Sequence, residues 1–333
     1  MTVSKISHTA QALLFAFALL GVPEIGLGAP VTVYKDYVFQ EPPAVVLNDL
    51  PRKNGCNPGT ATNDTRILVF GDSGTGDENQ KKVAAAMQKF CEKNGCDLAL
   101  MMGDNIHPTG VKSVEDPQFI AKFEKPYAGL CIPFYTMLGE HDWGRKGEMS
   151  NWRAQIEYTQ RSTRWRLPSD VYSLTIGDLK ILALNTNTLD TSPEQAAWLK
   201  KELENSKAGW NLVMGHKPIN SYGYHGDTDF MVAQLLPQLC GRADLYLSAH
   251  EHNLQVLKAD CGLPLLVAGS GGKLRTENAT GPRSLFGAPG LGFMYLQVQE
   301  QAIQAQVVSA TGDILYSFTI PQRNKPGPAD VNK

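Results

Sequence analysis

Five short apolar segments of this sequence each end in a small residue that is followed directly by an aspartate, a glutamate or a histidine. The junctions are Gly71-Asp72, Gly103-Asp104, Gly139-Glu140, Gly215-His216 and Ala249-His250. In open α/β sheets, ligands bind just beyond the carboxyl ends of the strands, on loops that a rigid scaffold holds in place. We therefore expect these polar residues to converge on one site, although they lie far apart in the chain.

The apolar segments have the composition and length of buried strands. Strands are predicted at 66–70, 98–102, 134–138, 211–214 and 245–248, and further strand-like runs at 265–268, 294–298, 303–308 and 315–320. Residues 171–176 and 180–185 flank Gly177-Asp178, a turn pair typical of β-hairpins.

Helical patterns lie between these strands. One covers 79–93, with Val83, Met87 and Phe90 on one side. A second helix is expected to begin after Ser192, with a capping box completed by Gln195, and a third is expected over 230–239. Alternating strands and helices predict an α/β fold, which we interpret as one domain of stacked mixed sheets with helices outside.

The N-terminus has the pattern of a secretion signal. Lys5 precedes an uncharged apolar run over 10–22, and the small residues Gly26, Gly28 and Ala29 follow it. The run is short for crossing a bilayer, and small residues are typical of a signal-peptidase site. We therefore expect a secreted or periplasmic protein without stable membrane association after cleavage; a retained N-terminal anchor is the alternative.

The expected organisation is a signal peptide over 1–28, an irregular lead-in over 29–64, the main domain over 65–321 and a loose tail over 322–333.

Cysteine usage agrees with export. The six cysteines are Cys56, Cys91, Cys96, Cys131, Cys240 and Cys261. An even number in an exported chain favours disulfides, but six cysteines allow fifteen pairings. We expect Cys91 to pair with Cys96 and Cys240 with Cys261, because each pair brackets a short local excursion.

The charge balance argues against a nucleic-acid partner. The 333 residues have a formal net charge of −2, whereas nucleic-acid binders usually carry a basic surplus. A small-molecule substrate is therefore the expected partner, and the oligomeric state stays open.

Histidines collect at the ends of the predicted strands. Five of them, His107, His141, His216, His250 and His252, lie on the loops after strands or within a few residues of one, and His225 follows in a loop rich in Gly and Tyr. With Asp72, Asp104 and Glu140, the histidines form a mixed oxygen and nitrogen donor set that suits Zn, Fe, Mn or Co. Two metals about 3.5–4 Å apart, bridged by a shared carboxylate, suit in-line displacement at phosphorus.

The motifs around these residues resemble the metallophosphoesterase signature. They are GDSG (71–74), GDN (103–105), GEHD (139–142), VMGH (213–216) and AHEH (249–252). The longer segments GDNIHPTGV (103–111), HKPINSYGYHG (216–226) and YLSAHEHNLQ (246–255) resemble the purple acid phosphatases, in particular the small tartrate-resistant type. The resemblance covers about residues 65 to 275, and five ordered motifs are more specific than any one of them.

This resemblance implies a fold and an activity. The fold is a four-layer α/β/β/α sandwich of two mixed β-sheets, and the activity is hydrolysis of phosphomonoesters by attack of a metal-bound hydroxide. The cofactors would be two divalent or mixed-valence transition metal ions, Fe, Zn or Mn. A nucleotidase or phosphodiesterase on the same scaffold is one alternative, and a non-catalytic homologue that binds metal or ligand is another.

The resemblance also implies roles for single residues. Asp72, Asp104 and His252 would hold the first metal and Glu140, His216 and His250 the second, with Asp104 as the bridge. His141 would contact the phosphate or protonate the leaving group. His225 would lie near the substrate.

Three positions depart from the family pattern. The family has Tyr where this chain has His107, Asn where it has Glu140, and Gly where it has Ala249. His107 could still bind the first metal; the alternative is that it lies behind the ligands without binding metal, or faces solvent. Without the tyrosinate the protein should not be purple. We hypothesise that the first two changes compensate, moving negative charge from the first metal to the second and favouring two divalent ions.

Overall fold

The computed structural model describes residues 37–47, 64–144, 150–277 and 279–323. All of them belong to one compact unit. The predicted signal peptide (1–28) lies outside the described residues, as do most of the lead-in and most of the tail. In the described part of the chain, no helix is long and apolar enough to cross a membrane.

Two mixed β-sheets form the middle of this unit. The eight-stranded sheet contains, in order, β1 (Ala44–Leu47), β6 (Tyr172–Ile176), β7 (Leu179–Leu184), β8 (Trp210–Gly215), β9 (Leu245–Ser248), β11 (Pro264–Ala268), β10 (Leu254–Lys258) and β12 (Ser284–Ala288). The seven-stranded sheet contains β15 (Ile314–Pro321), β14 (Ala302–Ser309), β13 (Gly292–Val298), β2 (Thr65–Phe70), β3 (Leu98–Met101), β4 (Phe134–Thr136) and β5 (Trp165–Arg166).

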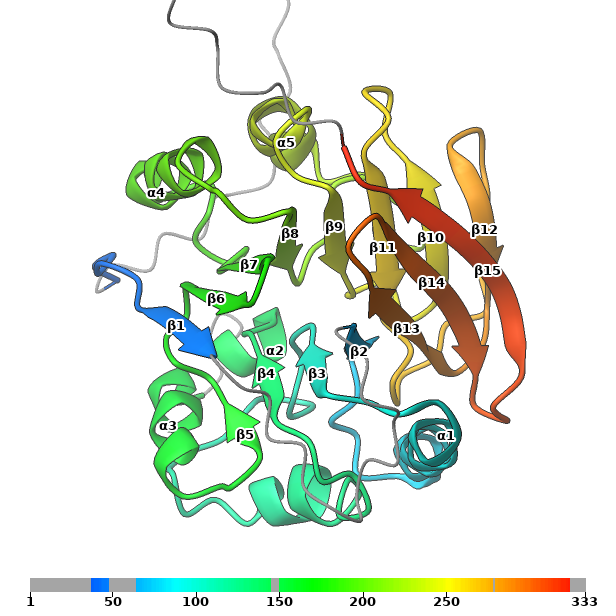
Figure 1. Cartoon of the computed structure of the whole chain (residues 1–333). Helices are drawn as coiled ribbons and strands as arrows, with labels where there is room; N and C mark the ends of the chain where they lie inside the picture. The colour runs from blue at the N-terminus through cyan, green and yellow to red at the C-terminus, as the bar shows by residue number, and fades with distance from the viewer. Residues whose placement is uncertain (1–36, 48–63, 145–149, 278, 324–333) are drawn as a thin grey trace, which may run out of the picture. The chain divides into compact units, whose positions relative to one another are not determined.

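Helices cover the outer faces of the two sheets (Figure 1). α4 (Pro193–Glu204) and α5 (Leu236–Leu239) pack on the eight-stranded sheet through residues such as Leu199 and Leu239. α1 (Glu78–Asn94) and α3 (Trp152–Glu157) pack on the seven-stranded sheet. This arrangement confirms the predicted four-layer α/β/β/α sandwich. A short helix, α2 (Glu140–Trp143), follows β4.

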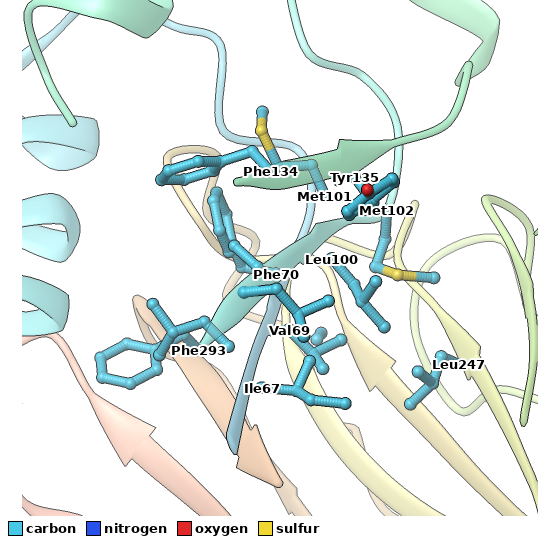
Figure 2. Packing of buried hydrophobic residues seen from close by; sticks show 14 of the residues in the cluster. Ile67, Val69, Phe70, Leu100, Met101, Met102, Phe134, Tyr135, Leu247 and Phe293 are labelled. Atoms are coloured by element: carbon cyan, nitrogen blue, oxygen red, sulfur yellow. The ribbon is translucent and has the colours of Figure 1, made fainter. Parts of the chain in front are cut away.

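The central strands are parallel, and all of their residues except Lys180 in β7 are buried. β2, β3 and β4 run parallel in one sheet, and β7, β8 and β9 run parallel in the other. Strands covered on both faces read as continuous apolar runs, and every residue of β2 is buried. Figure 2 shows part of this core, where side chains from β2, β3 and β4 lie together with Leu247 of β9, a strand of the other sheet. Five of these six strands, β2, β3, β4, β8 and β9, lead at their carboxyl ends into the five predicted junctions.

The predicted hairpin is confirmed. β6 and β7 pair antiparallel, from Tyr172 opposite Ala183 to Ile176 opposite Leu179. Gly177 in the turn has a φ of 54°, a left-handed conformation that glycine adopts without steric cost.

Two predictions about local structure were wrong. The lead-in was expected to be irregular, yet Ala44–Leu47 forms β1, which pairs parallel with β6; four residues at a sheet edge are too few to show a pattern. The predicted capping box at Ser192 does not form. Gln195 instead accepts a hydrogen bond from the Asn185 backbone N–H (2.8 Å) and donates to the Asn185 carbonyl (3.2 Å), because it is buried under the loop after β7.

Both predicted disulfides are present, Cys91–Cys96 and Cys240–Cys261. Cys131 is also disulfide-bonded. The first bridge closes the end of α1 onto the start of β3, and the second ties the end of α5 to the β10–β11 turn.

A buried ion pair joins the amino-terminal ends of β2 and β3. Arg66 donates through Nε (3.0 Å) and through Nη2 (2.9 Å) to the two oxygens of Asp97, and both residues are buried.

Asp97→Ala would leave the guanidinium buried without its partner, so we expect the free energy of unfolding to fall by about 3–5 kcal/mol in urea titrations. The double variant Arg66→Met/Asp97→Leu is expected to recover much of this loss. A loss below about 1 kcal/mol in the single variant would contradict this prediction.

Candidate metal centre

The backbone turns sharply immediately after the strands. Asp72, Asp104, His250 and His252 have φ values of 54°, 51°, 71° and 55°. Residues other than glycine seldom adopt such values, although Asp and His do so more often than most. Each such residue costs about 1–3 kcal/mol, and strain of this kind concentrates at functional sites.

The small residues at the junctions are required by close packing of these loops. A Cβ on Gly139 would lie 2.0 Å from Oδ1 of Asp104, and a Cβ on Gly103 would lie 2.6 Å from the backbone nitrogen of Gly139. A Cβ on Gly71 would lie 2.5 Å from the Cβ of Ala249. The methyl group of Ala249 is therefore accommodated because its neighbour across the loops is a glycine.

The polar residues gather into two groups, as the junction pattern predicts. Asp72, His107 and His252 form the first group, and Glu140, His216 and His250 form the second; in each, the candidate ligand atoms lie within 4.8 Å of one another. Nε2 of His252 lies 3.3 Å from Oδ1 of Asp72. Oε2 of Glu140 lies 2.7 Å from Nε2 of His216 and 3.1 Å from Nδ1 of His250.

Asp104 lies between the two groups and turns one oxygen toward each. Oδ2 is 3.8 Å from Nε2 of His107, on the side of the first group. Oδ1 is 3.6 Å from Nε2 of His216, on the side of the second group. A carboxylate placed in this way could contact a cation on either side.

Hydrogen bonds fix the orientation of the rings. His216 donates Nδ1–H to the backbone carbonyl of Met102 (2.7 Å), which can only accept, so Nε2 is left to face Asp104 and Glu140. His141 donates Nδ1–H to the carbonyl of Pro108 in the same way. Orientation of a histidine through its second nitrogen is typical of metal-binding sites.

The two histidines predicted to be catalytic flank the groups. Nε2 of His141 lies 3.7 Å from Oδ2 of Asp104, and its ring centre is 4.3 Å from that of His107. Asp104, His107 and His141 therefore also form a possible ligand set. The ring of His225 stacks on the ring of His250, with centres 4.0 Å apart.

Burial and neighbouring charges shift the pKa values of several groups in this centre. Burial and the neighbouring Glu140 raise the pKa of Asp104 well above its ordinary value. Burial alone would lower the pKa of His216, but Asp104 and Glu140 outweigh it and raise that pKa. Burial lowers the pKa of His107 to about 3, so this imidazole is neutral and can offer a lone pair at neutral pH.

Unpaired atoms in the centre also fit a cation. Within the described ranges, Oδ1 of Asp72, Oδ2 of Asp104 and Nε2 of His107 are buried and have no hydrogen-bond partner. Buried charged groups are normally paired or coordinate metals. The mixed carboxylate and imidazole donors therefore fit two transition metal ions, one in each group.

Asp142 ties the loop after β3 to the loop after β4. Its Oδ2 accepts from the backbone N–H of Asn105 (2.9 Å), from the Asn105 side chain (3.0 Å) and from the Gly139 N–H (3.0 Å). Its Oδ1 accepts from the Ile106 N–H (3.1 Å) and from the Gln155 side chain (3.0 Å). Because these loops carry Asp104 and Glu140, Asp142 sets the distance between ligands of the two groups.

Glu251 has a similar role at the other side of the centre. It is buried, and its Oε2 accepts from the backbone N–H of His225 (3.0 Å) and lies 3.5 Å from Nδ1 of the same residue. Sequence reasoning assigned no role to Asp142 or Glu251. Their position inside the GEHD and AHEH motifs was the available signal.

Comparison with known proteins identifies relatives over most of the chain. A model of the calcineurin-like phosphoesterase family matches residues 65–254. The chain is 31% identical to tartrate-resistant acid phosphatase type 5 of Sus scrofa, covering 82% of this chain and 93% of that protein. It is 30% identical to purple acid phosphatase 7 of Arabidopsis thaliana, covering 78% of this chain and 86% of that protein. A similar solved structure is GAP50, the anchor in the inner membrane complex of Plasmodium, with a TM-score of 0.70 and 24% identity over 79% of this chain and 90% of that one.

Asp142→Asn should disturb the metal centre without unfolding the protein. The new amide would turn an NH2 group toward N–H groups that now donate to a carboxylate oxygen. We expect the affinity for added Zn²⁺ to fall about 10- to 100-fold in a calorimetric titration, with unchanged circular dichroism. The control is Asp190→Asn, an exposed aspartate ahead of α4. Equal affinity in both variants would show that Asp142 does not position the ligands.

Proposed function

This chain belongs to the calcineurin-like phosphoesterase family, and we propose that it is an exported phosphatase that hydrolyses phosphomonoesters at a dinuclear metal centre. One observation carries the proposal: Asp104 lies between two groups of candidate ligand atoms and turns one oxygen toward each group. Relatives at about 30% identity over most of the chain are acid phosphatases.

The ligand assignment follows from the two groups. Asp72, Asp104, His107 and His252 would hold the first ion, and Asp104, Glu140, His216 and His250 the second. When bound, such a pair of ions supplies an acidic water for attack and neutralises charge on the phosphoryl oxygens. The chain itself contributes the fixed orientation of these ligands and the exclusion of water from the buried carboxylates.

His141 and His225 are proposed to act on the substrate. The Pro108 carbonyl holds His141 with its Nε2 toward the centre, where an imidazole can contact the phosphate or give a proton to the leaving oxygen. Glu251 holds His225 beside His250, at the edge of the second group. The two imidazoles would thus flank one phosphoryl group.

The donor set favours two divalent ions. Each group contains one carboxylate and two imidazoles. If Asp104 serves both ions, negative charge is spread evenly over the two sites. Carboxylate and imidazole suit Zn, Mn and divalent Fe. With His107 in place of a tyrosinate, the iron-loaded protein should lack a tyrosinate charge-transfer colour.

Export is proposed from the N-terminal pattern and from the disulfides. Bridges such as Cys91–Cys96 and Cys240–Cys261 form and persist in oxidising compartments. A secreted or periplasmic location fits both features. The expected partner is a small phosphoester.

Metal content and turnover test the proposal together. The purified mature chain is expected to bind about two metals, measured by elemental analysis, and to hydrolyse p-nitrophenyl phosphate when Mn, Zn or Fe is added. Asp104→Asn removes a bridging charge, so we expect it to lower metal content and to lower turnover at least about 100-fold, with Asp190→Asn as control.

Nucleotides and phosphodiesters belong in the same assay, because faster turnover on them would favour the nucleotidase or phosphodiesterase alternative. Two metals without turnover on any phosphoester would favour a non-catalytic binding protein, and no metal would show that the ligand set is wrong.

Glu140→Asn separates the two sites. A neutral amide would lose the charged contact that Oε2 now makes with both His216 and His250. We expect the second ion to bind at least about 10-fold more weakly in a calorimetric titration with Zn²⁺ or Mn²⁺, with the first ion less affected. Unchanged stoichiometry and affinity would contradict the assigned role of Glu140.

A further inference from the structure

A fully buried glutamine bonds to the loop that carries His225. Gln255 is the second residue of β10, and it has no access to solvent. Its Oε1 accepts a hydrogen bond from the backbone N–H of Tyr222 (2.9 Å), and its Nε2 donates to Oγ of Ser221 (2.9 Å). The side chain therefore holds the loop after β8 at two neighbouring residues.

The orientation of the Gln255 amide is fixed at both of its ends. The Tyr222 N–H can only donate, so the amide oxygen must face it. The amide nitrogen donates to Oδ1 of Asn253 (2.9 Å) as well as to Ser221, so each of its two hydrogens has an acceptor. A buried amide with all of these bonds made has one stable orientation, and it fixes its partners in turn.

Ser221 extends this constraint to the next residue of the loop. Its Oγ accepts from the backbone N–H of Gly223 (2.8 Å) as well as from Gln255. The loop also packs closely at this point, because a Cβ on Gly223 would lie 2.3 Å from Oε2 of Glu251. Residues 221–223 are therefore held in one conformation by contacts that depend on Gln255.

Glu251 holds the other end of the same short segment. Its Oε2 accepts from the backbone N–H of His225 (3.0 Å). Beyond this anchor the His225 ring rests on the ring of His250, with centres 4.0 Å apart, and 34% of the His225 side chain is exposed. No core surrounds the imidazole on all sides, so its position depends on the backbone that Gln255 and Glu251 hold.

We propose that Gln255 is a positioning residue that acts through His225. It fixes the turn over 221–223 and thereby holds the imidazole beside the second group of ligands. A shift of about 1 Å in a group that acts on the substrate can lower turnover by as much as about 100-fold. Gln255 bonds to the loop and to Asn253, so its effect on turnover is indirect. This inference rests on the proposed phosphatase function.

Gln255→Met tests this role, because methionine keeps the length of the side chain and removes its amide. We expect kcat for p-nitrophenyl phosphate to fall about 10-fold, whereas the affinity for Zn²⁺ in a calorimetric titration stays unchanged. Ser221→Ala should lower kcat by a smaller factor, because it leaves the bond between Gln255 and the Tyr222 N–H in place.

A double-mutant cycle separates positioning from a general effect on the fold. In a His225→Ala background, Gln255→Met should lower kcat less than about 2-fold, because the group that it positions is already absent. A residue with a merely structural role would lower kcat by the same factor in both backgrounds. Thermal unfolding followed by circular dichroism shows which variants are folded at the assay temperature. If Gln255→Met is not, the same cycle is measured with Ser221→Ala.

The control is Gln234→Met, at an exposed glutamine in η3 (Met231–Leu235), which should leave kcat unchanged. Equal factors in the two backgrounds, an unchanged kcat in His225→Ala, or a loss of Zn²⁺ affinity that parallels the loss of kcat would overturn the assignment. A wild-type protein that binds metal and hydrolyses no phosphoester would instead contradict the proposed function.

Discussion

The burial of Asp104 is the constraint on which the rest of this structure depends. Its carboxylate has no access to solvent, and its two oxygens face two different sets of imidazoles. Such a group is stable only if nearby positive charge compensates the lost hydration. Three features hold this one carboxylate in place: the left-handed turn at Asp104, the close packing of Gly103 and Gly139 around it, and the hydrogen bonds of Asp142. Two cations, one on each side, would supply the compensation that the protein alone does not.

The two-sheet architecture makes this convergence possible. Parallel strands of one sheet deliver Asp72, Asp104 and Glu140, and parallel strands of the other deliver the histidines after β8 and β9. The two sets meet where Asp72 accepts a hydrogen bond from the His250 N–H at 2.7 Å. Neither sheet alone could assemble the site. This explains why the ligands come from opposite halves of the chain.

The parts of this arrangement that the sequence predicted are those with local signals. A buried strand, a small residue and a polar residue form a pattern of a few positions, and every such junction lies at the centre. Strands at the sheet edges carry no such pattern. β12, for example, is short, contains a glycine and is only half-buried. The motifs GEHD and AHEH pointed to Asp142 and Glu251 but did not reveal their roles, because these depend on hydrogen bonds to residues 37 and 26 positions away. Gln195 shows the same limit. Its local sequence predicted a capping box, but in the structure its side chain instead bonds to the backbone of Asn185, ten residues earlier.

Charge balance links the metal centre to its surroundings. Asp72, Asp104 and Glu140 carry three negative charges when ionised, so two divalent ions would leave an excess of one positive charge for a phosphoryl group. Arg275 and Lys273 add positive charge on the side of His252 and His107, without carboxylates of the described residues to offset it. The two ends of the centre therefore differ: the surroundings of the first group add positive charge, whereas the second group is bordered by the buried carboxylate of Glu251.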